Sequence, residues 1–331
     1  MKANQYSAGN KESFGSELSI LEPEDTPFTS MVRKGKAHAT YHQVVADTLR
    51  PARNTGTRAG KGRTGGANKA KNREVFGCRQ HRVFEEWAVD DVQESITKAG
   101  GNYVTADEAD LAFSKAMREL KRDMEAINLG DQEGQGGGDD DMKTRGFFTW
   151  VQSSAQASDP VPSNFRTPAA SIITLGGGTL SETTTSGSYY SFNALAKSMK
   201  GVYGKKVNAE IFAGDDIVEM FDKFTRTSAT GAERYRVNQG EETHEISLYV
   251  TVFESSFIRA NIIPDQFVKI NSSGIGTAAA AAIVVPEFWE MAFLEELTSK
   301  DVEDDGGGVS GWIRGKYALC CSNPKGQGAI V

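Results

Sequence analysis

The stretch TADEADLAFSKAMRELKRDMEAINLG, residues 105–130, carries the strongest structural pattern in the chain. It opens with Thr105 and Glu108 in the spacing of a capping box, whose side chains satisfy free backbone N–H groups at a helix start. Apolar residues then recur at spacings of four and three, which places them on one helix face: Phe113, Met117, Leu120, Met124 and Ile127. We expect this face to pack on the core. Gly130 is the expected end of the helix.

The predicted helix is long for a globular protein, at about 37 Å with a rise of about 1.5 Å per residue. This length indicates that the helix is a central support, or spine, against which other elements pack. The remaining faces of this helix are polar, and we expect these side chains to point away from the core: Lys115, Arg118, Lys121, Arg122 and Glu125.

Two segments before the helix predict strands. Residues 36–49 and 75–89 are rich in β-branched and aromatic residues. Between them lies a Gly-, Lys- and Arg-rich stretch, and residues 50–75 contain no aromatic residue. We predict a long two-stranded hairpin with a wide tip. Because an isolated hairpin is barely stable in water, it should rest on another part of the protein.

The N-terminal segment, residues 1–32, predicts an extended, irregular arm. Pro23 and Pro27 stand four residues apart, and proline disfavours a helix both at its own position and at the residue before it. Apolar side chains on such an arm are better buried under an adjacent copy of the chain than left in water. These are Leu18, Ile20, Leu21 and Phe28.

The chain after the long helix predicts a mixture of helices and strands. Residues 191–202 are amphipathic, and residues 215–224 start with acids that suit a helix N-terminus. Residues 207–213 predict a buried strand between these two helices. Further strands are expected near 246–253, 257–263, 266–270 and 280–285.

Charge is distributed very unevenly. The chain has a formal net charge of −7, which argues against a dedicated nucleic-acid-binding protein. Residues 33–82 nevertheless contain thirteen Lys or Arg against two acids, a local net of +11, and residues 287–305 contain eight acids against one lysine. A chain with one basic and one acidic region can bind copies of itself.

We expect the basic segment of one copy to contact the acidic region of the next. The basic residues assigned to this contact are Arg50, Arg53, Arg58, Lys61, Arg63, Lys69, Lys71 and Arg73. The acidic partner surface consists of Glu287, Glu290, Glu295, Glu296, Asp301, Glu303, Asp304 and Asp305.

The basic segment also contains glycines in nucleotide-site spacing, but the chemistry of such a site is missing. Gly60, Gly62 and Gly65 form a G-x-G-x-x-G, yet no helix pattern follows to place a helix N-terminus at a phosphate. Gly56 is only four positions before Gly60, and Gly62 stands where a P-loop needs Ser or Thr. We therefore exclude a nucleotide cofactor.

No metal or catalytic site is predicted. His38 and His42 are four apart on a strand rather than a helix, and His42 could face His81 across the hairpin in an ordinary structural contact. The run of three aspartates at 139–141 lacks the alternating spacing of a calcium loop. No serine stands in a G-x-S-x-G elbow. We expect no catalytic residues and no cofactor.

The cysteines and the apolar runs restrict the location of the protein. Cys78, Cys320 and Cys321 form no C-x-x-C pair and no even framework, so we interpret them as small packing residues in a reducing compartment. The first ten residues contain no apolar run, which indicates no signal peptide. The longest apolar run, residues 278–285, is too short to span a bilayer, so no membrane contact is expected.

Several stretches taken in order resemble a known family. They are LEPEDTPFTS at 21–30, ELKRDMEAINLG at 119–130, RGFFTW at 145–150, VNAEIFAGDDIVEMFDKF at 207–224 and YALCCSNPKGQGAIV at 317–331. Together with the order of elements, they resemble the major capsid proteins of tailed bacteriophages, which have the HK97 fold, in the branch that is not processed. Arg314 and Lys316 depart from this pattern, because relatives tend to carry an acid nearby.

The resemblance implies an α+β fold with five successive parts. These are an N-terminal arm at 1–33, an extended E-loop at 34–92, a P-domain with the spine helix at 93–144, an A-domain at 145–285, and P-domain return strands with the C-terminus at 286–331.

The resemblance also implies a function and partners. Copies of the chain would form the hexamers and pentamers of an icosahedral shell that encloses double-stranded DNA, assembled in the bacterial cytoplasm and found in the virion. A portal, a separate scaffolding protein and a cement protein are the expected partners. The expectation of a separate scaffold rests on the short arm, which leaves no room for a fused one.

Two alternatives stay open. An encapsulin-type compartment has the same architecture and stores an enzyme instead of DNA. A DNA-binding protein could use the basic hairpin to contact phosphates. Proteins that bind single-stranded nucleic acid usually place aromatic residues among the basic ones, however, and residues 50–75 contain none.

Overall fold

The structure is a computed structural model that describes residues 26–47, 52, 54, 73–92, 108–136, 141–175, 188–226, 237–239, 244–246, 251–270, 276–302 and 307–331. Its helices are α1 (Pro27–Met31), α3 (Glu108–Asn128), α4 (Phe147–Trp150), α5 (Ser188–Tyr203) and α6 (Asp215–Arg226), with short 3-10 helices η2 (Ala169–Ser171), η4 (Pro286–Phe288) and η5 (Pro324–Gly326).

Its strands form one sheet of four, one of six and two pairs. They are β1 (Arg33–Lys36), β2 (Tyr41–Ala46), β3 (Glu74–Arg79), β4 (His81–Val89), β5 (Ile172–Ile173), β6 (Val207–Ala213), β7 (Val237–Gln239), β8 (His244–Ile246), β9 (Val252–Glu254), β10 (Ile258–Pro264), β11 (Ala281–Val284), β12 (Trp289–Val302), β13 (Val309–Cys321) and β14 (Gly328–Ile330). The mixture confirms the expected α+β class.

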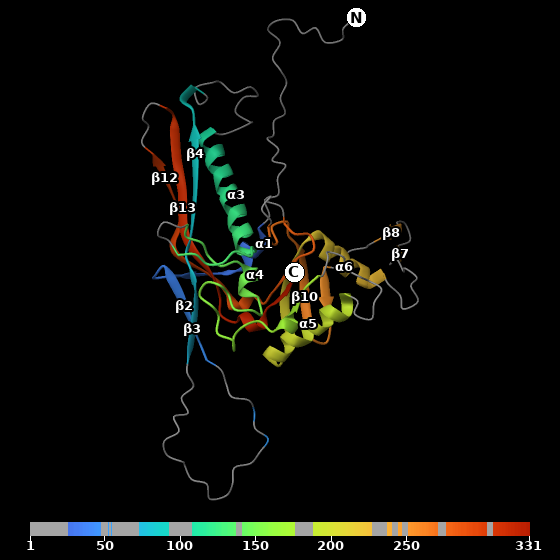
Figure 1. Cartoon of the computed structure of the whole chain (residues 1–331). Helices are drawn as coiled ribbons and strands as arrows, with labels where there is room; N and C mark the ends of the chain where they lie inside the picture. The colour runs from blue at the N-terminus through green and yellow to red at the C-terminus, as the bar shows by residue number, and fades with distance from the viewer. Residues whose placement is uncertain are drawn as a thin grey trace, which may run out of the picture.

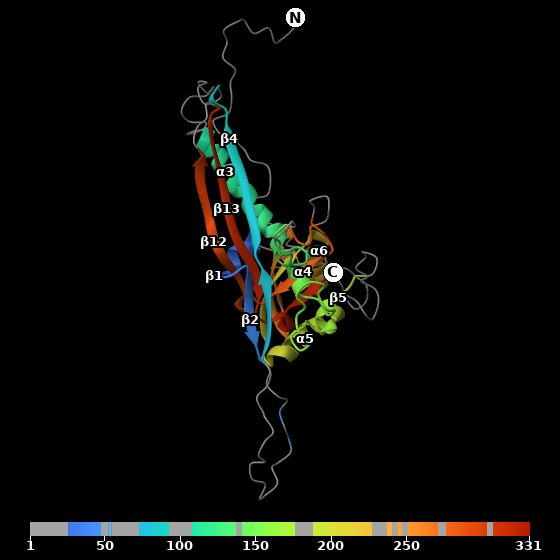
Figure 2. The same cartoon turned by 60° about the vertical axis from the view of Figure 1, so that its left-hand side comes forward.

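The four-stranded sheet and α3 form an elongated layer beside a rounder body (Figure 1). The strand order is β1-β12-β13-β4, and the two long central strands run antiparallel. α3 lies along one face of this sheet in both views (Figures 1 and 2). Trp87 of β4 meets Phe113 of α3 there, with ring centroids 6.1 Å apart. The amphipathic helix α3 thus packs mainly on β4, with further contacts to β13.

The predicted spine helix is present, but its buried face is turned from the predicted one. Leu120 and Met124 are buried as expected, whereas Ile127 is only half-buried. Ala116 is buried as well, because its small side chain lets the helix approach the sheet closely. Phe113 and Met117 are half-buried against the core. Thr105, the predicted capping residue, lies outside the described residues.

The predicted hairpin is only partly correct. β2 and β3 do pair antiparallel over their full lengths. The second half of segment 75–89, however, is β4, which pairs with β13 in the four-stranded sheet instead of with the first strand. The change of partner falls at Gln80, which is buried and donates its backbone N–H to the Thr40 carbonyl at 3.1 Å. A continuous apolar pattern cannot show where a strand exchanges one partner for another.

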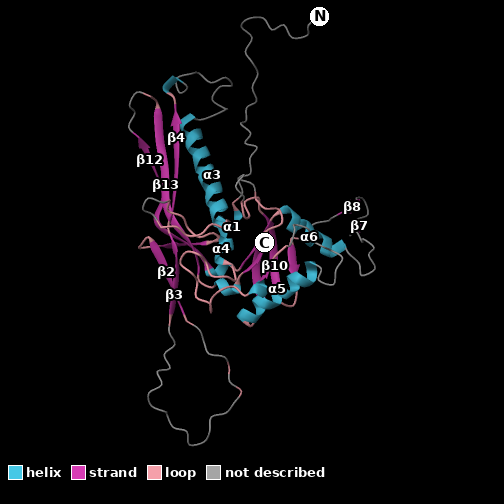
Figure 3. Cartoon of the chain, in the orientation of Figure 1, coloured by secondary structure: helices cyan, strands magenta, loops and turns pink. Residues whose placement is uncertain are grey.

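The six-stranded sheet forms the centre of the rounder body, with α5 and α6 packed beside it (Figure 3). Its order is β5-β14-β11-β6-β10-β9. Side chains of both helices share a second core with the sheet: Phe192, Leu195, Met199, Ile217 and Phe221 from the helices, and Ile211, Ile258 and Ile283 from the strands. The predicted strand 207–213 matches β6, and the predicted helices at 191–202 and 215–224 lie within α5 and α6.

One of the strands predicted in this body is wrong. Residues 266–270 form a turn rather than a strand, because the Asp265 carboxylate accepts the Phe267 backbone N–H at 2.7 Å and Lys269 adopts a φ of +48°. β14 lies between β5 and β11. The end of the chain therefore belongs to the six-stranded sheet, whereas the expected division grouped residues 286–331 with the other layer.

Four aromatic residues connect the two layers, and we call them the aromatic joint: Phe28, Phe147, Phe212 and Trp289. They come from α1, α4, β6 and β12, and all four are fully buried. Phe28 stands at the centre, with ring centroids 5.4 Å from Phe212, 6.0 Å from Trp289 and 6.5 Å from Phe147 in edge-to-face geometry. Such aromatic contacts contribute beyond the area that they bury.

The interpretation of the cysteines as packing residues is wrong for two of the three. Cys78 of β3 and Cys320 of β13 form a disulfide across a sequence separation of 242 residues. Cys321 stays free and buried. The spacing in the sequence could not reveal the pair, because only the folded arrangement of β3 and β13 brings the two residues together.

The packing of α3 predicts the effect of shortening its central side chain. Leu120→Ala should lower the free energy of unfolding by about 2–5 kcal/mol, because it opens a cavity where α3 meets the four-stranded sheet. Lys121→Ala, at the exposed neighbouring position, should change it by less than about 0.5 kcal/mol. Urea denaturation of the unassembled subunit measures both. Equal effects of the two substitutions would show that α3 does not pack as described.

Candidate assembly interface

The predicted contact residues fall mostly outside the part of the chain that the structure describes. This applies to Leu18, Ile20 and Leu21 of the arm, and to every residue of the basic set except Arg73. Arg73 is exposed and directly precedes β3. The described parts of the interface are therefore the base of the arm at α1, the base of the hairpin in β2 and β3, and the exposed faces of the two layers.

The root of the arm differs from the prediction. Residues 27–31 form one turn of helix, α1, with Pro27 at its first position, where a missing N–H costs nothing. Phe28 is fully buried within its own chain, in the aromatic joint, and is not available to an adjacent copy as expected. The proline that argued against a helix is thus the residue that starts one.

A buried carboxylate from α3 caps this short helix. Thr26 makes no side-chain cap, and Glu125 instead accepts the backbone N–H groups of Phe28 and Thr29, each at 2.7 Å. Those N–H groups have no partner within the helix, and a negative charge at a helix N-terminus is favourable. Asn128 donates to the Thr29 hydroxyl at 3.1 Å and fixes it in place.

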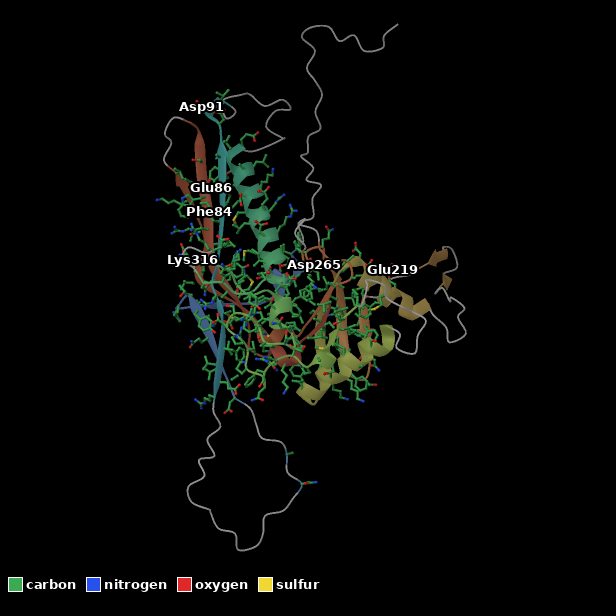
Figure 4. The ribbon with its side chains drawn as sticks, viewed as in Figure 1. Phe84, Glu86, Asp91, Glu219, Asp265 and Lys316 are labelled. Carbon is green, nitrogen blue, oxygen red and sulfur yellow. A yellow bond between two sulfur atoms is a disulfide. The ribbon has the colours of Figure 1, made fainter. Side chains whose placement is uncertain are left out.

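The surroundings of Glu125 shift its ionisation. Burial raises the pKa of Glu125, while hydrogen bonds from Thr29, Phe28 and the Asp265 carboxyl partly offset that rise. Asp265 follows β10 of the six-stranded sheet and lies between the two layers (Figure 4). Sequence reasoning placed Glu125 on the solvent side of α3. No local signal could correct this, because its partners lie nearly a hundred residues away.

The root of the hairpin is held against the chain that leads into the rounder body. Phe76 of β3 is buried against Trp150 and Phe165, with ring centroids 6.2 and 5.7 Å apart. Arg79 makes a two-pronged ion pair with Asp159, with Nε–Oδ2 at 2.5 Å and a second contact at 3.2 Å. Two-pronged pairs of this kind fix orientation as well as distance.

Arg145 extends this contact into the interior. Its side chain is buried and donates to the backbone carbonyls of Ser158 and Asp159, and its guanidinium lies 4.7 Å from the centroid of the Trp150 ring. Burial lowers the pKa of Arg145, and the charge of Glu133 opposes that shift. Asp159 has a φ of +46°, which turns its carbonyl and its carboxylate toward the two arginines. The hairpin therefore leaves the body from a fixed base.

The predicted acidic surface is partly neutralised within the chain. Glu290 pairs with Arg33, and Glu295 pairs with Lys316 at 3.1 Å and with Arg314 at 2.9 Å. Both contacts lower the pKa of Glu295, and the hydrogen bond from Lys316 has the larger effect. Exposed members of the set are Glu287, Glu296 and Asp301, and the rest lie outside the described residues: Glu303, Asp304 and Asp305.

Sequence reasoning missed an exposed aromatic patch on the sheet face opposite α3. We define the patch as Arg82, Phe84, Trp312 and Arg314. The rings of Phe84 and Trp312 stack at 6.4 Å, and the guanidiniums of Arg82 and Arg314 lie over them at 5.5 and 4.6 Å. Phe84 is 41% exposed, and Figure 4 shows it on the long strand with Glu86. Aromatic and arginine side chains are enriched in protein interfaces.

The predicted histidine contact is absent. His42 lies opposite Cys78 in the β2–β3 ladder, and His81 lies opposite Tyr317 in the four-stranded sheet. Within the described residues, no three His, Cys, Asp or Glu side chains group as metal ligands. In that same part of the chain, no helix has the length and apolar character needed to cross a membrane.

Comparison with known proteins gives one family. A family model described as SU10 major capsid protein matches residues 1–331. No curated protein matches the chain.

Solved structures share the fold at low sequence identity. The chain is similar to the capsid of a native GTA particle, with a TM-score of 0.62, 10% identity, and coverage of 98% of this chain and 95% of that one. A structure from Mycobacterium phage Bobi gives a TM-score of 0.57 and 10% identity, with 97% and 95% covered. The capsid structure of the cyanophage P-SCSP1u gives 0.53 and 13%, with 99% and 92% covered.

The cap on α1 predicts a local effect of removing the carboxylate. Glu125→Ala leaves the buried N–H of Phe28 and the partly buried N–H of Thr29 without an acceptor and should cost about 2–5 kcal/mol, with faster hydrogen exchange at both residues. Glu125→Gln, which keeps one acceptor oxygen, should be milder. Glu119→Ala removes only an exposed pair with Lys115 and should cost less than about 1 kcal/mol. Unchanged exchange at Phe28 in Glu125→Ala would contradict the cap.

The half-buried His81 predicts how stability depends on pH. Burial lowers the pKa of His81 to about 4, with the Lys143 charge acting in the same direction and that of Asp141 against it. The folded state therefore favours neutral His81, and this contribution is complete above pH 6.5. It is lost as the pH falls from 6.5 toward 4, by at most about 1.4 kcal/mol per pH unit.

His81→Gln should remove this contribution, so the unfolding free energy of the variant should fall less steeply over the same range. Denaturant titrations of both proteins at several pH values measure the difference. Parallel pH profiles would show that His81 does not titrate in this way.

Proposed function

The chain belongs to the SU10 major capsid protein family, and we propose that it is the major capsid protein of a tailed bacteriophage, which assembles with its own copies into a closed shell. The observation that carries the proposal is the family match over the whole chain. The capsid structures with the same fold support it, because their coverage is nearly complete in both directions.

The shell consists of hexamers and pentamers in icosahedral arrangement and encloses double-stranded DNA, in the virion after assembly in the bacterial cytoplasm. Contacts of this kind join different surfaces of neighbouring copies and close into rings. A portal, a separate scaffolding protein and a cement protein are the further partners. The role is structural, and the proposal includes no catalysis, no cofactor and no membrane.

The parts of the chain have distinct roles in the proposal. The arm at 1–33 and the E-loop at 34–92 reach to neighbouring copies, and the P-domain at 93–144 provides the spine. The A-domain at 145–285 lies at the ring axes, and residues 286–331 return through the P-domain. β14 is the exception, because its hydrogen bonds lie in the six-stranded sheet.

The intersubunit contact joins opposite charges. The basic residues of segment 50–73 contact the acidic surface of the next copy, and the exposed Glu287, Glu296 and Asp301 are its accessible members. The aromatic patch adds a second contact, since exposed aromatic and arginine side chains contribute strongly when water is excluded from them. Leu18, Ile20 and Leu21 anchor the arm on a neighbour.

Electron microscopy of the expressed protein tests the function directly. Negatively stained samples should contain rings of five or six copies, or closed shells. Particles that stay monomeric in the presence of the phage scaffold would refute the proposal. Shells filled with a host enzyme instead of DNA would indicate the compartment alternative, which none of the comparisons favours.

The charged contact predicts a defect in assembly rather than in folding. Reversal of five basic residues to Glu (Arg58, Lys61, Arg63, Lys69 and Lys71) should abolish shells in sucrose-gradient sedimentation. The subunit should keep its wild-type unfolding midpoint, because both described cores are formed by residues elsewhere in the chain. Reversal of Lys115 and Lys121, exposed on α3, is the matched control and should leave shells intact. Normal shells from the fivefold variant would overturn the contact.

A further inference from the structure

The disulfide lies at the point where the hairpin meets the body. Cys78 is two residues before Gln80, where β3 ends and the chain continues as β4. Cys320 is near the end of β13, beyond the last β4–β13 pair at Tyr317. The bond therefore connects the two-stranded sheet of β2 and β3 to the four-stranded sheet at a place where no ladder joins them.

Without the bond, the base of the hairpin keeps only non-covalent support. Phe76 packs in its aromatic pocket on one side of Cys78, and the Arg79–Asp159 pair lies on the other. These contacts set the direction of the hairpin, but as non-covalent contacts they resist rotation about Gln80 less than a covalent bond does. A covalent link to β13 restricts that rotation further, because the strand is then fixed on both sides of the break.

We propose that the Cys78–Cys320 pair is a redox lock, open as dithiol while the shell assembles and closed as disulfide once the particle has left the cell. The inference rests on the proposed function, because only a particle that leaves the reducing cytoplasm passes from one state to the other. During assembly the hairpin adapts to rings of five and of six. Afterwards its angle is fixed in each position.

The chemistry requires an oxidant outside the cell. The two thiols lose two protons and two electrons as the S–S bond forms. Dioxygen accepts them and becomes hydrogen peroxide, or a small disulfide accepts them and becomes two thiols. The Cα atoms of the two cysteines are 5.8 Å apart, a separation that a disulfide spans without backbone movement. The fold thus brings the thiols into position before oxidation.

The third cysteine does not interfere with the lock. Cys321 directly follows Cys320 but is fully buried. Burial raises the pKa of Cys321, so little thiolate forms there to attack the neighbouring disulfide. Cys78 and Cys320 are only 2% and 3% exposed, so soluble oxidants and reductants react with them slowly.

The first test follows the thiols through release. Cells that contain assembled shells are lysed without oxygen in denaturant with N-ethylmaleimide, because both thiols are buried in the folded chain, and peptides are analysed by mass spectrometry. Cys78 and Cys320 should carry the label. A parallel sample, exposed to air or oxidised glutathione before labelling, should contain the linked peptide pair. A linked pair in the anaerobic lysate, or free thiols after prolonged oxidation, would overturn the lock.

The second test measures its effect on the particle. Oxidised wild-type shells should dissociate and unfold at a temperature about 5–10 °C higher than wild-type shells assembled and kept in dithiothreitol. Cys78→Ala and Cys320→Ala should each abolish this difference, and Cys321→Ala, the matched control, should keep it. The wild-type comparison alone decides the result if either variant fails to fold. Shells with no redox dependence contradict only the lock, whereas absence of any shell contradicts the proposed function.

Discussion

The structure depends on one buried carboxylate. Glu125 of α3 accepts two backbone N–H groups of α1, and this contact places Phe28 at the centre of the aromatic joint. Because Phe28 touches residues from both layers, the cap on a five-residue helix also sets how the four-stranded and six-stranded sheets meet. A buried charge is costly unless it is fully hydrogen-bonded. For Glu125 the donors are the backbone N–H groups of the first turn of α1, which have no partner within that helix.

This joint determines what the chain can present to its neighbours. The arm leaves the joint at α1, and the hairpin leaves from a base held by Phe76, Arg79 and Cys78. Two extensions therefore start from fixed points on a rigid body. The hairpin segment, residues 33–82, carries the excess of positive charge, while the remainder of the chain, the arm included, is acidic. Fixed bases for both extensions suit the proposed assembly, in which they reach to neighbouring copies.

The sequence predicted the regular elements better than their contacts. The period of apolar residues located α3, and β6 matched residue for residue, because both depend on local pattern. The cap by Glu125, the disulfide from Cys78 and the change of partner at Gln80 were missed. Each depends on residues far apart in the chain, so the local pattern at Glu125 is that of an exposed helix position. The prediction of an irregular arm failed at Pro27 for a different reason. Proline disfavours the interior of a helix but is common at its first position, where α1 begins.

The central claim is that the basic segment 50–73 functions between copies of the chain rather than within one. A cryo-electron microscopy reconstruction of the assembled shell tests it most directly. The account predicts that side chains of this segment contact acidic residues of an adjacent subunit in both rings, with the aromatic joint unchanged. A shell in which the segment contacts only its own subunit or DNA would contradict the claim.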